Sequence, residues 1–134
     1  RLGVRSSAHT VTKLLDPFGG RSLRVVPVTH PDYLRRMEEV LGAQGGTAVL
    51  MRGSEGEPYA SPKRMPALIG LRDGRPTELV AQGEHEEETA GLPPDIGVAA
   101  TVAWMRAVLC GQAPLPRPLS RQLACLLAAA RAPG

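Results

Sequence analysis

Three basic side chains recur at intervals of four residues near the start of the sequence. Arg5, His9 and Lys13 stand at i, i+4 and i+8 in a stretch whose apolar residues repeat with helical spacing. On a helix each step of four residues drifts by only about 40°, so the three side chains would share one edge. A row of cations attracts anions, and arginine in particular binds phosphate well. Ordinary solvated helices also carry such rows, so this alternative stays open.

A second group of charged residues lies in the stretch RGSEGEPYASPKR, residues 52–64, directly after the apolar run TAVLM. Its basic residues are Arg52, Lys63 and Arg64. Glu55 and Glu57 are weak candidates for metal ligands, because Mg²⁺ prefers carboxylate oxygens. An ordinary solvated turn is the alternative for both.

Tyr59 is the one aromatic residue of this stretch. It would suit stacking on a base, as in proteins that bind single strands, or simple packing at the surface. Aromatic residues make up only 3% of the chain, which argues against an extended stacking platform. The net charge of +3 permits a polyanionic partner without requiring one. A bound nucleic acid would therefore be held by its backbone, with little sequence preference.

The hydrophobic pattern predicts the elements that carry these residues. Strands are expected at 24–28 and 47–51, joined by a helix at 31–42. Such a unit makes the two strands parallel neighbours. A hairpin is expected from ALIGL and TELVA around RDGRP, followed by two C-terminal helices. The sequence thus predicts an α/β fold, a parallel sheet with flanking helices.

The two C-terminal helices are predicted to contribute to the core. Residues 95–110 are apolar nearly all round, which is typical of a buried helix, and Trp104 is expected inside. The last helix is expected to begin at a Ser120 cap. Its predicted inward residues are Leu123, Leu126 and Leu127.

The stretch 52–64 follows the second strand, and open α/β sheets bind ligands at the carboxyl ends of their strands. We therefore expect the basic residues to line one groove there and to hold a nucleic-acid backbone. The six residues are Arg5, His9, Lys13, Arg52, Lys63 and Arg64.

Cys110 and Cys125 lie in apolar surroundings without a metal or disulfide pattern. They are expected to be buried free thiols in a reducing compartment, which favours the cytoplasm. No apolar run is long enough to span a bilayer, so no membrane partner is expected. The chain opens on Arg1 rather than Met, which suggests the C-terminal piece of a longer protein.

Three stretches in order resemble the catalytic α/β domain of anthranilate phosphoribosyltransferases. They are LGVRSSAHTVTKLLDP, VTHPDYLRRMEEVL and AVLMRGSEGEPYASPKR. The resemblance implies a nucleoside phosphorylase/phosphoribosyltransferase-like fold with a β-hairpin and C-terminal helices. Residues 1–134 would be the C-terminal portion of that domain. An N-terminal helical domain, absent from this chain, would make the full-length protein a homodimer.

The departures from that family decide which function the resemblance implies. Arg5 stands where the enzymes keep an arginine that contacts the aromatic acid acceptor. His9 replaces an asparagine, and Lys13 replaces a proline. The Asp-Glu pair that binds magnesium falls on Pro58 and Tyr59, and phosphoribosyl transfer needs the metal at the leaving pyrophosphate. The chain is more similar to the divergent YbiB-type branch, which is associated with non-specific nucleic-acid binding.

The favoured hypothesis is therefore a non-catalytic protein without a cofactor that binds nucleic acid, single-stranded and irrespective of sequence. One alternative is a phosphoribosyl or glycosyl transferase that uses Mg²⁺ and an unknown acceptor. Another is a small α/β interaction module with no ligand of its own.

Overall fold

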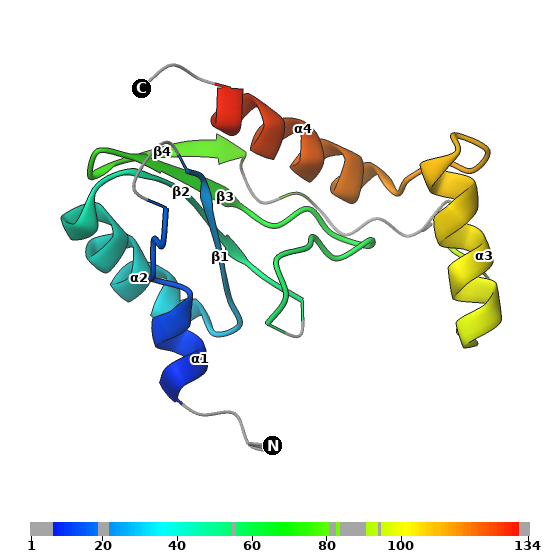
Figure 1. The fold of residues 1–134 in the computed structure, drawn as a ribbon, viewed down its shortest axis with the longest axis horizontal. Coiled ribbons are helices and arrows are strands. Elements are labelled where there is room, and N and C mark those ends of the chain that lie inside the picture. The colour runs from blue at the N-terminus through cyan, green and yellow to red at the C-terminus, as the bar shows by residue number, and fades with distance from the viewer. Residues whose placement is uncertain are drawn as a thin grey trace.

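A computed structural model describes residues 7–18, 22–54, 56–80, 83, 91–93 and 95–131. The candidate residues Arg5 and Glu55 lie outside these ranges. Figure 1 shows the order of the elements along the chain. They are α1 (Ser7–Thr12), β1 (Arg24–Val28), α2 (Pro31–Gln44), β2 (Thr47–Arg52), β3 (Leu68–Arg72), β4 (Arg75–Val80), α3 (Val98–Leu109) and α4 (Arg117–Arg131).

The sheet is mixed rather than parallel. β1 and β2 are parallel neighbours joined by α2, with Val26 beside Leu50, which confirms the predicted strand–helix–strand unit. β3 then runs antiparallel to β2, and β4 antiparallel to β3. The prediction of a parallel sheet is therefore wrong for half of the strands. A parallel third strand usually needs a crossover helix, and the described residues between β2 and β3, 53–54 and 56–67, form no helix.

The predicted hairpin is confirmed, with a tighter turn than expected. Arg72 pairs with Arg75, so only Asp73 and Gly74 lie between the strands. Both have positive φ, 47° and 80°, as a two-residue hairpin turn requires. Glycine is needed at position 74 for space as well, because a Cβ there would lie 2.6 Å from the carbonyl oxygen of Gly42.

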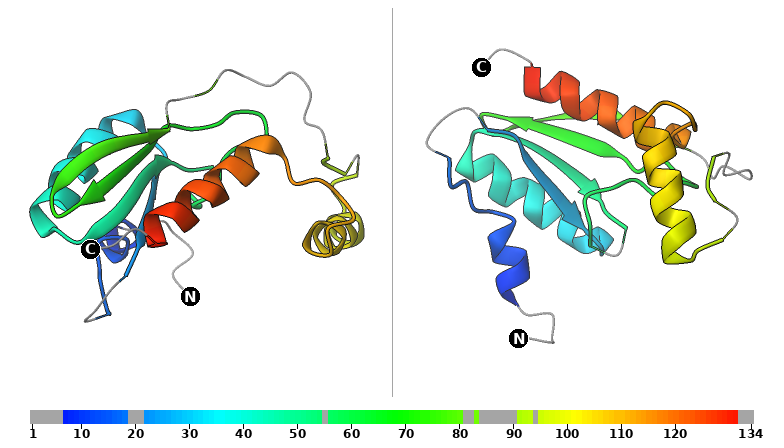
Figure 2. Two further views of the ribbon diagram at one scale, coloured as in Figure 1. Left: turned by 90° about the horizontal axis from the view of Figure 1, so that it is seen from above. Right: turned by 45° about the vertical axis from the view of Figure 1, so that its right-hand side comes forward.

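The domain has three layers, with α2 on one face of the sheet and α4 on the other (Figures 1 and 2). Successive residues of β2 point to opposite faces. Ala48 and Leu50 join the cluster under α2, whereas Val49 and Met51 join the cluster under α4. All four are buried, so β2 is the centre of the core.

The start of α2 is fixed by His30, which occupies the N-cap and accepts a hydrogen bond from the Asp32 amide. Pro31 follows at the first turn, where its missing N–H costs nothing. Met37 and Leu41 are buried against the sheet. The helix ends at Gly45, whose φ of 71° suits glycine.

The prediction that the helix at 95–110 is buried is wrong in this structure. α3 has no buried residue, and the side chains of Val98 and Leu109 are 82% and 84% exposed. Trp104, predicted to be core, is half-buried, and its indole N–H donates to the carbonyl of Gly91. The reason is position: α3 lies beyond the end of the sheet, and neither hydrophobic cluster includes a residue from it (Figure 1).

The last helix begins earlier than predicted. α4 starts at Arg117, so Ser120 lies inside the helix, where its hydroxyl donates to the Arg117 carbonyl instead of capping the N-terminus. Its inward face also differs from the prediction. Leu123 and Leu127 are 50% and 46% exposed, whereas Leu126 packs against the cluster.

The residues of α4 that turn inward are smaller or more polar than leucine. Pro118 and Gln122 are buried, and Cys125 and Ala129 are partly buried against the same cluster. Both cysteines are free thiols as predicted, but Cys110 is exposed rather than buried. None of the described helices combines the length and apolar content needed to cross a bilayer.

Candidate functional site

Two cavities lie at the carboxyl ends of β1 and β2, one on each side of the first turn of α2. The first has a volume of about 500 Å³ and is lined by residues that include His9, Thr10, Lys13, Thr29, Tyr33 and Glu57. The second has a volume of about 490 Å³ and is lined by residues that include Pro31, Arg52, Ser54, Ser61, Lys63 and Arg64. The end of the sheet named in the sequence analysis thus carries two cavities, although another of about 460 Å³ lies near Thr47 and Arg75 at the opposite end of β2.

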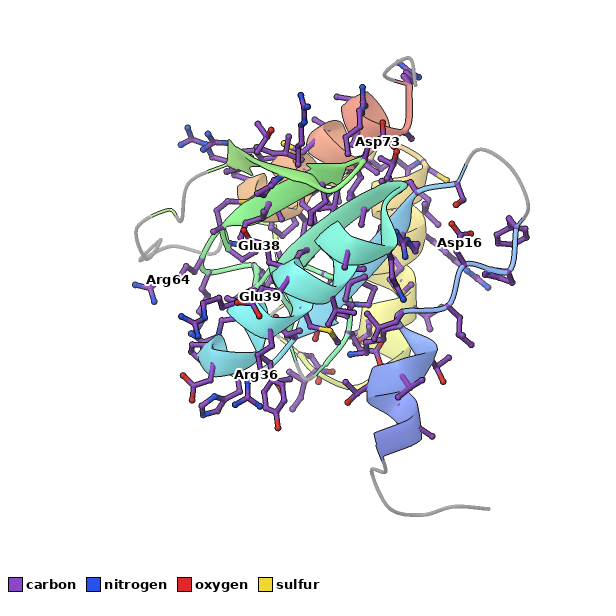
Figure 3. The ribbon with its side chains drawn as sticks, turned by 90° about the vertical axis from the view of Figure 1, so that its left-hand side faces the viewer. Asp16, Arg36, Glu38, Glu39, Arg64 and Asp73 are labelled. Carbon is purple, nitrogen blue, oxygen red and sulfur yellow. The ribbon has the colours of Figure 1, made fainter. Side chains whose placement is uncertain are left out.

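The predicted basic residues divide between these cavities. Arg52, Lys63 and Arg64 line the second cavity together, whereas His9 and Lys13 line the first. The start of α2 lines both cavities, with Tyr33 in the first and Pro31 and Leu34 in the second. This helix therefore separates His9 and Lys13 from the three basic residues of the second cavity. Figure 3 shows the same division, with Arg64 on one side of α2 and α1 on the other.

Lys13 has a structural partner on each side of it. Its ammonium group donates to the carbonyl of Pro27 at 2.9 Å and to that of Gly56 at 3.2 Å. These bonds tie the segment after α1 to the edge strand β1 and to the loop after β2. Two of the three ammonium donors are therefore already engaged.

The loop after β2 begins with a tight turn that only glycine can start. The Gly53 amide donates to the carbonyl of Val28 at 2.9 Å, which continues the β1–β2 ladder. A Cβ at Gly53 would lie 2.4 Å from the Glu57 carbonyl oxygen and 2.7 Å from Cβ of Pro27. The chain then reverses between Ser54 and Glu57, whose amide donates back at 2.8 Å.

A second tight turn carries two of the cations. The Arg64 amide donates to the Ser61 carbonyl at 3.1 Å, and the Lys63 amide donates to the Ser61 hydroxyl at 3.3 Å. Both ends of this turn are anchored, because Ala60 and Met65 are buried. The side chains of Lys63 and Arg64 are exposed on a short turn between fixed ends.

Gln122 of α4 holds this loop, and the sequence analysis missed it. Its amide oxygen accepts from the Ala60 N–H at 2.6 Å, and its amide nitrogen donates to the Pro58 carbonyl at 2.9 Å and to the Met51 sulfur at 3.1 Å. The side chain is 4% exposed and is the one buried polar side chain in the described residues. The available signal was its position midway between Pro118 and Leu126, each four residues away, which places all three on one face of the helix.

The charged residues that the structure describes in the lining of the second cavity are all basic. They are Arg52, Lys63 and Arg64. The first cavity is more nearly balanced, because Glu57 joins Lys13 and His9 in its lining. The positive potential is therefore expected to be stronger at the second cavity, and an anion should bind there more readily.

The described residues do not fit a magnesium site. No group of three or more His, Cys, Asp or Glu side chains among them is placed to hold a metal ion. Glu57 is exposed, and the carbonyl of Pro58 is engaged by Gln122. Tyr59 is 42% exposed, and its amide donates to the Glu57 carbonyl. Neither cavity lining includes Tyr59, whose stacking on a base stays a prediction.

No protein-family model matches the sequence. The chain is similar to the uncharacterized protein YbiB of Escherichia coli (strain K12), with 41% identity over 133 residues. The aligned segment covers 96% of this chain and 40% of YbiB, so the chain spans less than half the length of this relative. The predicted resemblance to YbiB-type proteins is thereby confirmed.

Proposed function

We propose that this chain is part of a nucleic-acid-binding protein, and that single strands bind through their phosphates irrespective of sequence. One observation carries the proposal: Arg52, Lys63 and Arg64 line a single cavity, and no other described residue of its lining is an Asp or Glu. All three side chains are exposed, so no burial has to be reversed before they meet a ligand.

Phosphate is the anion that this set of residues suits. Two of the three cations are arginines, whose planar guanidinium groups can bind phosphate oxygens in pairs. A cavity of about 490 Å³ accommodates more than one phosphate group, and its open rim would let a strand continue on either side. A polyanion also releases counterions from each phosphate that is neutralised, which favours a nucleic acid over a lone phosphate.

Sequence-independent binding follows from the chemical groups that these three side chains offer to a ligand. Their side chains supply donors only, which contact phosphate oxygens without reading a base. Tyr59 in the same loop could stack on any base, because stacking discriminates little between bases. His9 and Lys13 in the first cavity would extend the basic surface on the other side of α2.

We propose further that the protein lacks phosphoribosyltransferase activity, although three stretches of its sequence resemble the catalytic domain of the anthranilate enzymes. Support comes from positions 58 and 59, where Pro58 gives its carbonyl to Gln122 and Tyr59 offers no carboxylate. We also propose that the full-length protein is a homodimer, as the resemblance implies, and that it is cytoplasmic, because its two free cysteines suit a reducing compartment.

Direct binding tests the proposal. Fluorescently labelled single-stranded oligonucleotides of several base compositions, matched in length, are titrated with the protein at low salt and followed by anisotropy. We expect similar affinities for all compositions. The triple variant Arg52→Ala/Lys63→Ala/Arg64→Ala should lose most of the binding, because three phosphate contacts are removed.

The matched control removes a charge at the other end of the sheet. Arg75 is exposed and pairs with Arg72, which in turn lies beside Thr47 at the amino end of β2. Arg75→Ala should bind nearly as the wild type does. Undetectable binding by the wild type at low salt would refute the proposal, and so would equal losses in Arg75→Ala and Arg64→Ala. Magnesium-dependent release of pyrophosphate from phosphoribosyl pyrophosphate with anthranilate would refute its non-catalytic part.

A further inference from the structure

We propose that Gln122 is a positioning residue that holds the basic loop in its binding conformation before a ligand arrives. This inference rests on the nucleic-acid binding proposed above. It concerns a residue of α4, more than fifty positions from the cations in sequence, which contacts none of the expected phosphates. The argument starts from the backbone of residues 58–60.

Residues 58–60 have no strand to pair with, yet part of their backbone is buried. Ala60 is fully buried, so its N–H needs a hydrogen-bond partner inside the protein. Gln122 supplies that partner at 2.6 Å and takes the Pro58 carbonyl with its other amide atom at 2.9 Å. One side chain thereby replaces the ladder that a neighbouring strand would have provided.

The two bonds fix both sides of Tyr59 and set the starting point of the next turn. Ser61 follows Ala60 directly, and its carbonyl and hydroxyl hold the amides of Arg64 and Lys63. At the far end of the turn, Met65 is buried and its carbonyl accepts from the Gly83 amide at 2.9 Å. The segment that carries the two cations therefore has one anchor in the core at Met65 and another that depends on Gln122.

Gln122 is itself held rigidly. It lies one turn after buried Pro118 on the face of α4 that packs against the sheet. Its amide nitrogen also contacts the sulfur of Met51, a buried residue of β2. The loop is thus fastened to the same core that holds the strands. Pre-ordering of this kind raises affinity, because the loop loses less conformational entropy on binding.

The experiment compares Gln122→Met with Leu126→Ala. Methionine keeps the length of the side chain and removes both hydrogen bonds to the loop. Leu126 lies on the same helix and packs against the same cluster, but its apolar side chain makes no hydrogen bond to the loop. Circular dichroism establishes the temperature range in which each variant is folded, and every other measurement is made there.

Two readouts are taken, amide hydrogen exchange at Ala60, Lys63 and Arg64 and anisotropy with a labelled single-stranded oligonucleotide. For Gln122→Met we expect faster exchange at these amides and an affinity lower by roughly three- to tenfold, because the backbone of the loop must now be ordered on binding. The slope of log affinity against log salt should stay unchanged, because the cations remain. Leu126→Ala should leave both exchange at these amides and affinity as in the wild type.

Unchanged affinity in folded Gln122→Met overturns the positioning role, and so does an equal loss in Leu126→Ala. If Gln122→Met does not fold, the wild type decides: its Ala60 amide should be protected without the oligonucleotide and no further protected with it. Protection that appears only on binding overturns the inference. A wild type that binds no oligonucleotide refutes the proposed function, whereas the exchange data still show whether Gln122 anchors the loop.

Discussion

Replacing Lys13 by Met should destabilise the fold more than it weakens phosphate binding. The methionine side chain keeps most of the lysine stem and removes the ammonium group. That group donates to the carbonyls of Pro27 and Gly56, at 2.9 and 3.2 Å, in a partly buried position. Its loss unties the loop after β2 from the segment after α1.

The size of the effect follows from those two bonds. A hydrogen bond to a charged group contributes roughly 1.5–3 kcal/mol when it is well formed and buried. The bond to Gly56 is long, and water can reach both carbonyls once the ammonium is gone. We therefore expect the free energy of unfolding to fall by about 2 kcal/mol, a loss that corresponds to about one such bond rather than two. For a domain of this size that corresponds to a melting temperature lower by roughly 5–10 °C.

The loss of stability is measured by urea denaturation followed by circular dichroism. Tryptophan fluorescence would be less suitable, because the single tryptophan lies in α3, which contributes no residue to the core clusters. Salt titrations of oligonucleotide binding measure the phosphate contacts. Arg64→Ala should lower the slope of log affinity against log salt by about 0.7, the value for one phosphate of a single strand. Lys13→Met should lower it by less, since two of its three donors bond to the protein.

Two results would refute this reasoning. One is a Lys13→Met variant as stable as the wild type, which would mean that the two carbonyl contacts contribute nothing. The other is a slope reduced in Lys13→Met as much as in Arg64→Ala, which would assign the ammonium group to a phosphate.

Three further substitutions test other parts of the structure, each by urea denaturation. Gly53→Ala should destabilise the protein by about 1–3 kcal/mol, because its Cβ would clash with the Glu57 carbonyl; wild-type stability would contradict the tight turn. Gly74→Ala should cost a similar amount, since φ is 80° and the Gly42 carbonyl lies 2.6 Å from the added atom, and an unchanged midpoint would disprove the hairpin turn. Leu109→Ser should change stability by less than about 0.5 kcal/mol, and a larger loss would mean that this side of α3 is covered in solution.

The sequence was sufficient to predict the β1–α2–β2 unit and the hairpin, because the local sequence signals there agree with the packing in the structure. The β1–α2–β2 unit was predictable because the hydrophobic period changes from two to about 3.6 and back, and because His30-Pro31 and Gly45 mark the ends of the helix. The hairpin was predictable from Asp73-Gly74, a pair that favours positive φ. The direction of β3 was not, because turn residues between two strands do not specify on which side the chain returns.

The two C-terminal helices show that a hydrophobic pattern does not reveal which surface, if any, a helix packs against. An apolar helix is expected to be buried, but burial needs a surface to pack on, and none of the described core reaches α3. In α4 three leucines were predicted to face inward, but only Leu126 does so, and Gln122 shares that face with it. The reason is the loop backbone at Pro58 and Ala60, whose need for hydrogen bonds selects an amide over a larger apolar side chain.

The sequence predicted at which end of the sheet the candidate residues lie, but not how they are arranged there. Position after β2 placed Arg52, Lys63 and Arg64 at the correct edge of the sheet. Helical spacing placed His9 and Lys13 at the same end, but it could not show that the first turn of α2 stands between the two sets. Contacts between segments distant in sequence, such as that of Lys13 with Gly56, follow from the packed structure alone.

The most direct test of the central claim is the salt dependence of single-strand binding by the wild type and the triple variant Arg52→Ala/Lys63→Ala/Arg64→Ala. If each of the three cations neutralises one phosphate, the slope of log affinity against log salt should become shallower by about 2 units in the variant. A slope that is the same in both proteins would show that these residues do not contact the phosphates and would contradict the account.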